Sequence, residues 1–306
     1  MSTSQDPKKH HFVPVFYLKA WAGADRQLVR FHRPYRKVVP DRKFPDAMGY
    51  QEHLYTFENV PLQFRQTLEK EFFHPVDTKA AEAHQLLLAG QLNALTNDQR
   101  VAWARFMMST QLRTPSGLQE LQHIVEQNMR KIMGIKDDVD YNTAFRQPGD
   151  PETTYDWLCQ HEPQVIENAH KQFLPGLIDH EHLGEHLINM DWSTIGLQEA
   201  SNTLLTSDRP LLSTGGWKDP KAVLLFPLSK RCLFAATNSR AQTGIVHSGT
   251  LSPLVKMVND LIVRHTVDAV FGDTASHLGF VERRLRKRDE EPIPGPIGKG
   301  RPGCPA

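Results

Sequence analysis

The hydrophobic pattern of this chain changes once, near residue 192. Between about residues 64 and 190, apolar side chains recur at the three- and four-residue spacing of helices that bury one face. Helices followed by strands predict an α+β fold, in which a mainly helical N-terminal and middle region packs on a small C-terminal β-sheet. A strand around Val29 is expected to join that sheet. The expected strands are short apolar runs bounded by Ser, Gly, Pro and Lys, at residues 192–195, 203–206, 223–226 and 232–236.

Short polar signals predict where several helices begin and end. Thr96, followed three residues later by Gln99, has the spacing of a capping box. The proline after Thr114 is expected to end a helix, because proline disfavours helical geometry in the residue before it. Asp77 is a predicted N-cap, and the polar stretch 134–151 is a predicted loop.

The chain of 306 residues is long enough for one large domain. The pattern predicts a flexible leader at residues 1–9 and a single α+β domain at residues 10–281. Residues 282–306 are first basic and then rich in Pro and Gly, a composition typical of a disordered tail.

Composition argues against several classes of protein. The formal net charge of +1 disfavours a generally basic nucleic-acid coat, although a local basic groove is compatible with it. No apolar run has the length of a membrane span, and the N-terminus lacks the apolar core of a signal peptide. The three cysteines lie far apart and predict neither a disulfide framework nor a zinc ribbon. We therefore expect a cytoplasmic protein with no membrane partner.

Two adjacent histidines, His10 and His11, precede a helix that is expected to begin near Pro14. Beside the free N–H groups of a helix start, a histidine can face a pocket and act as a general base or a metal ligand. The structural alternative is that the pair caps the helix or bonds to a buried carboxylate. Neighbouring side chains of a strand point to opposite sides, so both rings are not expected to bind one metal ion unless the backbone turns.

Gln111 and Arg113 stand at the end of a predicted helix. A cation at this end is favoured by the helix dipole, which is a structural reason for the arginine. A guanidinium beside an amide also suits recognition of phosphate or carboxylate. In the functional interpretation these two residues bind substrate together with the basic residues Lys9 and Arg30.

Asp208 lies in a polar turn, Thr206 to Pro210, that follows an apolar run. Loops at strand ends often carry active residues, and this carboxylate could hold a metal ion or orient a histidine. The structural alternative is an ordinary Asp/Ser turn whose exit is fixed by the proline.

Other motifs give weaker or negative signals. Residues 182–186 fit H-x-x-E-H, the order of an inverted zincin motif, but Gly184 weakens the helix and the chain has 15 histidines, so chance explains the spacing best. The sequence contains no P-loop, no dinucleotide-binding glycine fingerprint and no G-x-S-x-G elbow.

The ordered set of these blocks resembles a bacterial family, the domain of unknown function 4238. Its opening is His-His-x-Val-Pro-x-x-Tyr-Leu after a lysine, and the resemblance covers roughly residues 8 to 272. It supplies candidate residues and a bacterial source, and it implies no reaction. The matching blocks are at residues 10–18, 54–56, 71–77, 111–115, 206–210 and 226–229, with Asn259 in a closing helix.

Two hypotheses follow from these residues. The first is a hydrolase of phosphodiesters or nucleic acid with a divalent metal as cofactor, in which His10, His11 and Asp208 are catalytic. The opening is similar to the histidine corner of ββα-metal nucleases, but the asparagine and second histidine of that fold are missing. The second is a non-catalytic binding or interaction protein, for example in phage defence, whose blocks form a buried polar network. The solvent exposure of these side chains distinguishes the two hypotheses, since a catalytic side chain must reach an open cleft.

Overall fold

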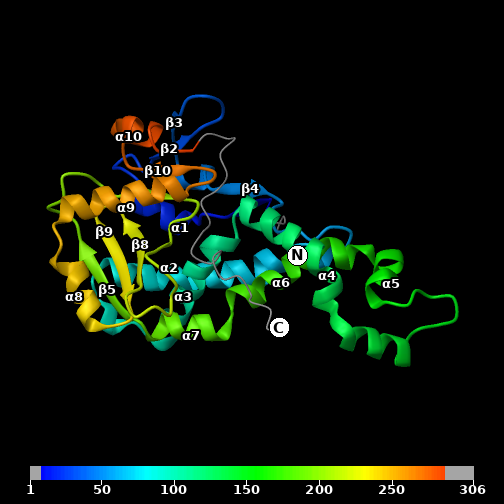
Figure 1. Ribbon diagram of the computed structural model, residues 1–306. Helices are drawn as coiled ribbons and strands as arrows, with labels where there is room; N and C mark the ends of the chain where they lie inside the picture. The colour runs from blue at the N-terminus through cyan, green and yellow to red at the C-terminus, as the bar shows by residue number, and fades with distance from the viewer. Residues whose placement is uncertain (1–7, 287–306) are drawn as a thin grey trace, which may run out of the picture.

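The computed structural model describes residues 8–286 (Figure 1). The predicted α+β class is confirmed. Most of the expected leader and tail, residues 1–7 and 287–306, lies outside the described residues. Lys9 already belongs to a strand, and Glu282 ends the last helix.

The elements follow the chain in three groups. The N-terminal group has short elements: β1 (Lys9–His11), α1 (Val15–Leu18), 3-10 turns (Lys19–Trp21, Pro45–Ala47, Leu62–Phe64), β2 (Leu28–His32), β3 (Val39–Lys43) and β4 (Tyr50–Glu52). The helical group is a π-helix (Leu68–Phe73), α2 (His74–Leu88), a 3-10 turn (Leu92–Ala94), α3 (Asn97–Leu112), α4 (Pro115–Ala144), α5 (Thr154–His161), α6 (Pro163–Ile178) and α7 (Glu181–Asn189). The C-terminal group is β5 (Asp191–Gly196), β6 (Thr206–Ser207), β7 (Leu212–Ser213), β8 (Val223–Ser229), β9 (Cys232–Thr237), α8 (Arg240–Ser248), α9 (Leu251–His265), β10 (Val270–Gly272), a 3-10 turn (Ala275–His277) and α10 (Leu278–Glu282).

An antiparallel sheet with the order β5-β9-β8-β7 divides the body into two hydrophobic cores. Along β8, Leu224 and Phe226 contribute to the core that contains α2 and α3, whereas Val223 and Leu225 contribute to the core that contains α9. In Figure 1, α9 crosses one face of this sheet and α2 and α3 lie on the other. Because successive residues of a strand face opposite sides, the consecutive apolar residues from Val223 to Phe226 bury both faces of β8.

A second antiparallel sheet has the order β3-β2-β10-β6. The expected Val29 strand therefore joins C-terminal strands, but in this sheet and not in the one formed by β5 and β7 to β9: Val29 pairs with Gly272 and Arg42. The predicted strand at residues 203–206 is shorter, since only Thr206 and Ser207 pair.

Local signals placed several boundaries correctly. Thr96 and Gln99 form a complete capping box, and α3 and α4 separate at Thr114, whose hydroxyl caps α4. Asp77 does not cap a helix: α2 begins at His74 as the continuation of the π-helix, so Asp77 lies inside its first turn.

The predicted loop at residues 134–151 is wrong over its first part. The helix bends at Gly134, where φ is 66°, and then continues to Ala144. Glycine allows this positive φ, so Gly134 forms a kink that joins two helical segments without an intervening loop. The end of α4 and α5 form an arm that extends away from the body (Figure 1). Arg130 and Asp156 join the two helices of the arm through a bidentate ion pair.

None of the helices between residues 8 and 286 has the length and apolarity of a membrane span.

Candidate functional site

His10 is completely buried in the two-stranded sheet of β1 and β4, where it lies opposite Gln51. Its Nδ1 accepts a hydrogen bond from the Tyr55 backbone N–H at 2.8 Å. Its Nε2 lies 2.9 Å from Oε1 of Gln66, so Nε2 carries the proton and donates. Both ring nitrogens are therefore used inside the protein, and neither is open to a substrate.

His11 points to the other side of the strand, as alternation along β1 requires. Its ring is half-buried, packs against Tyr50 at 5.5 Å between centroids, and has a lowered pKa because burial disfavours the charged form. Within residues 8–286, Nε2 of His11 has no hydrogen-bond partner. Of the two adjacent histidines, this one has an unused nitrogen.

Arg113 is the centre of the polar interior beside these histidines. It is 1% exposed, and its two terminal nitrogens donate to the Asp77 carboxylate at 2.7 and 2.9 Å. It also donates to the His11 carbonyl at 2.8 Å, and its guanidinium lies over the Phe73 ring. Burial alone would lower the pKa of Arg113, but Asp77 and Tyr55 raise it above its ordinary value. The guanidinium stays charged and holds three segments together.

Glu69 is a residue that the sequence did not single out. It lies on the π-helix, and within the described chain its buried Oε2 has no hydrogen-bond partner. Burial raises its pKa to about 7, with Asp77 acting in the same direction and Arg113 against it. The sequence around it reads as one charged face of an ordinary helix. Only the wider π turn, which has no sequence signature here and recurs at functional sites, turns this carboxyl inward.

Asp208 is buried at the end of β6 and serves the backbone. Its carboxylate accepts the N–H groups of three consecutive residues, Val267 at 3.3 Å and Asp268 and Ala269 at 3.2 Å. Burial raises its pKa to about 6, together with the neighbouring Asp268. The carboxylate thus fixes the turn between α9 and β10, and no contact joins it to His10, His11 or Arg113 in the described structure.

The remaining family blocks meet through buried hydrogen bonds. The Tyr17 hydroxyl donates to the Pro227 carbonyl at 2.7 Å and accepts from the Thr206 hydroxyl at 2.7 Å. The amide of Gln111 reaches the Leu211 carbonyl at 3.4 Å. These contacts connect the N-terminal helix, the end of α3 and the C-terminal strands.

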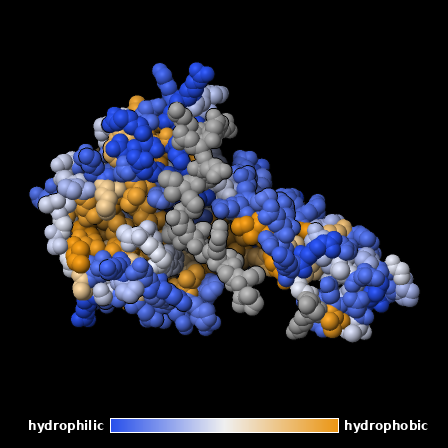
Figure 2. Space-filling model, in the orientation of Figure 1, coloured by the Kyte–Doolittle hydropathy of each residue, from blue (hydrophilic) through white to orange (hydrophobic). Residues whose placement is uncertain are grey.

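The two basic residues expected to bind substrate do not join this group. The Lys9 ammonium lies 4.6 Å from the centroid of the Tyr50 ring, on the surface. Arg30 is paired with Asp41 at 2.8 Å in the β2–β3 hairpin, whose surface at the top of Figure 2 is hydrophilic. The charge of Arg30 is therefore neutralised by a carboxylate of the same hairpin.

The donor set does not fit a divalent metal. Between residues 8 and 286, no group of three or more His, Cys, Asp or Glu side chains is placed to hold a metal ion. The His182–His186 spacing has a structural explanation in part, because Nε2 of His186 lies 2.7 Å from the Trp217 carbonyl.

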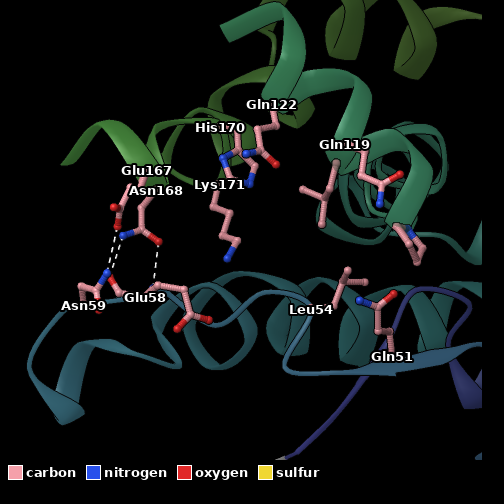
Figure 3. A pocket seen from close by; sticks show the side chains of 12 residues that line it. Gln51, Leu54, Glu58, Asn59, Gln119, Gln122, Glu167, Asn168, His170 and Lys171 are labelled. Carbon is pink, nitrogen blue, oxygen red and sulfur yellow. Dashed lines mark hydrogen bonds between the residues drawn. The ribbon is translucent and has the colours of Figure 1, made fainter. Parts of the chain in front are cut away.

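An open cleft of about 480 Å³ lies beside the buried blocks (Figure 3). The segment 51–59 forms one side, and α4 and α6 form the other. Thr114 and Pro115, which end one family block, begin the α4 wall. Its lining is Gln51, Leu54, Glu58, Asn59, Pro115, Leu118, Gln119, Gln122, Glu167, Asn168, His170 and Lys171.

Comparison with known proteins identifies the family. The model of the family described as "Protein of unknown function (DUF4238)" matches residues 9–276. The chain belongs to this family. No curated protein and no solved structure matches it. Membership therefore agrees with the resemblance seen in the sequence and assigns no activity.

The raised pKa of Glu69 predicts a pH-dependent stability. The folded chain binds this proton more tightly than the unfolded chain, whose carboxyl titrates near 4.5. The contribution is complete below about pH 4.5 and is lost as the pH rises through about 7. Relative to the parent, the free energy of unfolding of Glu69→Gln should increase over this range by on the order of 2 kcal/mol. Urea denaturation at several pH values measures this difference in the free energy of unfolding. The exposed neighbour provides the control Glu71→Gln, which should follow the parent; a parallel Glu69→Gln profile would contradict the assignment.

Removal of the Asp208 carboxylate should destabilise the fold. Asp208→Ala leaves the N–H groups of residues 267–269 without their acceptor, which should cost on the order of 3 kcal/mol. Asp208→Asn keeps one acceptor oxygen and should cost less. Thermal unfolding measures both, with the exposed Asp137→Ala as control. Parent-like stability of Asp208→Ala would show that the turn does not depend on this group.

Proposed function

We propose that the chain is a non-catalytic binding protein whose family blocks form a buried polar network. The observation that carries the proposal is the burial of His10, Arg113 and Asp208, all of which bond to groups of the protein itself. A catalytic acid, base or nucleophile must come within hydrogen-bond reach of the substrate. These three side chains instead hold the strand β1, the helices and the turn before β10.

The open cleft supports the binding half of the proposal. It lies between segments that the network fixes: Tyr55, inside the 51–59 segment, donates its N–H to His10 and its hydroxyl to the Arg113 carbonyl at 2.7 Å. A rigid wall reduces the entropy lost when a ligand binds. In this interpretation the buried blocks contribute to function by holding the cleft in one shape.

One observation favours a second candidate, hydrolysis of phosphodiesters. His11 has an unpartnered Nε2 within residues 8–286, and Glu69 has a pKa of about 7. Both groups feel the charges of Arg113 and Asp77. An unprotonated imidazole beside a carboxyl group that titrates near neutral pH is a pair that general acid–base catalysis can use. A metal is not part of this candidate.

Loss of His10 tests the buried network. His10→Ala leaves the Tyr55 N–H and the Oε1 of Gln66 without this partner and should cost on the order of 3 kcal/mol of stability. The exposed His74→Ala is the matched control and should change stability little. Thermal unfolding of both variants measures the difference. Equal stability of the His10→Ala variant and the parent would contradict the network.

Hydrolysis is tested on the same purified proteins. The parent should not cleave bis(p-nitrophenyl) phosphate or single-stranded DNA and RNA, with or without Mg²⁺, Mn²⁺ or Zn²⁺. Turnover that disappears in His11→Ala and Glu69→Gln, while both variants remain folded, would overturn the binding proposal and establish the second candidate.

A further inference from the structure

The wall of the cleft at Glu58 and Asn59 is closed by the protein itself. Asn168 on α6 exchanges two hydrogen bonds with the Glu58 backbone, at 2.9 Å from its N–H and 2.8 Å to its carbonyl. Asn59 donates to Glu167 at 2.9 Å (Figure 3). This clamp joins the 51–59 segment to α6 and defines one end of the cleft. Its polar groups are already paired and are not the ones that would recognise a ligand.

The opposite part of the cleft combines an apolar surface with free amides. Leu54 and Leu118 are buried side chains in its lining, and Pro115 lies beside them. Gln51 and Gln119 are exposed, and their amide groups make no hydrogen bond in the part of the chain that the structure describes. In Figure 3 they lie on opposite sides of the cleft, with Gln51 beside Leu54. Each amide can donate and accept, so the pair suits a ligand with both kinds of group.

Among the described residues, Lys171 is the one Lys or Arg side chain in the cleft lining. Its ammonium donates to the Thr56 carbonyl at 2.6 Å and has further N–H groups to donate. Burial lowers its pKa, and Glu58 opposes that change. Since Glu58 and Glu167 also line the cleft, its charge does not favour a phosphate. The ligand should therefore be an uncharged group with an acceptor atom for Lys171.

We propose that this cleft binds a nucleobase, presented by a free nucleoside or by an unpaired base of a single strand. A base has a flat apolar face that can pack on Pro115 and on the small exposed part of Leu54 and Leu118, and an edge on which donors and acceptors alternate. Glutamine amides match such an edge with paired hydrogen bonds, and lysine matches the acceptor edge of a purine. The cavity volume of about 480 Å³ is in the range of small-molecule sites. This inference rests on the proposed function, because it names the ligand class of the binding protein.

The test is calorimetric titration of the full chain with adenosine, guanosine, cytidine and uridine. At least one nucleoside should bind saturably. The affinity should change little between about 50 and 500 mM NaCl, because no phosphate contact contributes. Gln119→Leu and Gln51→Leu should each weaken binding about tenfold. The matched control is Gln127→Leu, which lies on the same helix outside the lining and should leave the affinity unchanged.

Further titrations show whether the bound base belongs to a free nucleoside or to a single strand, and they test competing ligands. A ten-nucleotide single strand that binds more tightly than its nucleoside, with the same loss in Gln119→Leu, assigns the site to nucleic acid; equal affinity assigns it to free nucleosides. Both results support a base-binding cleft. Binding of ribose or of a neutral tripeptide without any nucleoside binding would overturn it, as would unchanged affinity in Gln119→Leu. The His10→Ala melting result does not depend on these titrations, so failure of this inference is distinct from failure of the proposed function.

Discussion

A guanidinium removed from water must keep its charge neutralised and its N–H groups bonded, or the fold loses several kcal/mol. Arg113 meets the charge requirement with a carboxylate from α2, and one of its terminal nitrogens also donates to a backbone carbonyl of β1, whereas its Nε–H has no partner among the described residues. The partners cannot be replaced by solvent, so α2, the end of α3 and β1 must arrive together in one geometry. The pairing of Arg113 also explains several of the contacts around it. Tyr55 bonds to the carbonyl of the same arginine, and His10 bonds to the backbone of Tyr55.

The features that could be predicted from the sequence are those whose cause is local. The capping box at Thr96 and the helix break at Thr114 depend on a few neighbouring residues, and both are present. The apolar runs of β8 and β9 are strong enough to indicate strands without knowledge of their partners. By contrast, the part of α4 beyond Gly134 is held by contacts with α5, where Tyr141 packs on Trp157 and Asp138 accepts the Thr154 N–H. A glycine in a polar stretch looks the same in a loop as in a bent helix.

The candidate site shows the same division. The sequence identified Arg113 and the two histidines, and strand alternation correctly separated the two rings. It could not show that His10 has two internal partners or that Asp208 binds three backbone N–H groups, because these contacts join segments about 45 to 60 residues apart. Glu69 was missed because its inward position comes from a π turn. The cleft was missed because Gln51 and Gln119 are unremarkable polar residues until the fold brings them to one opening.

The Tyr17 hydroxyl has a consequence for how the chain is made. Its two partners, Thr206 and Pro227, lie 189 and 210 residues later. During synthesis the N-terminal aromatic helix therefore leaves the ribosome long before the strands that cover it exist. Closing so large a loop costs entropy before the contacts are gained, which makes this a late event in folding. Until β8 is complete, Tyr17 and Trp21 lack part of their native cover, so the nascent chain exposes apolar surface that the finished fold buries.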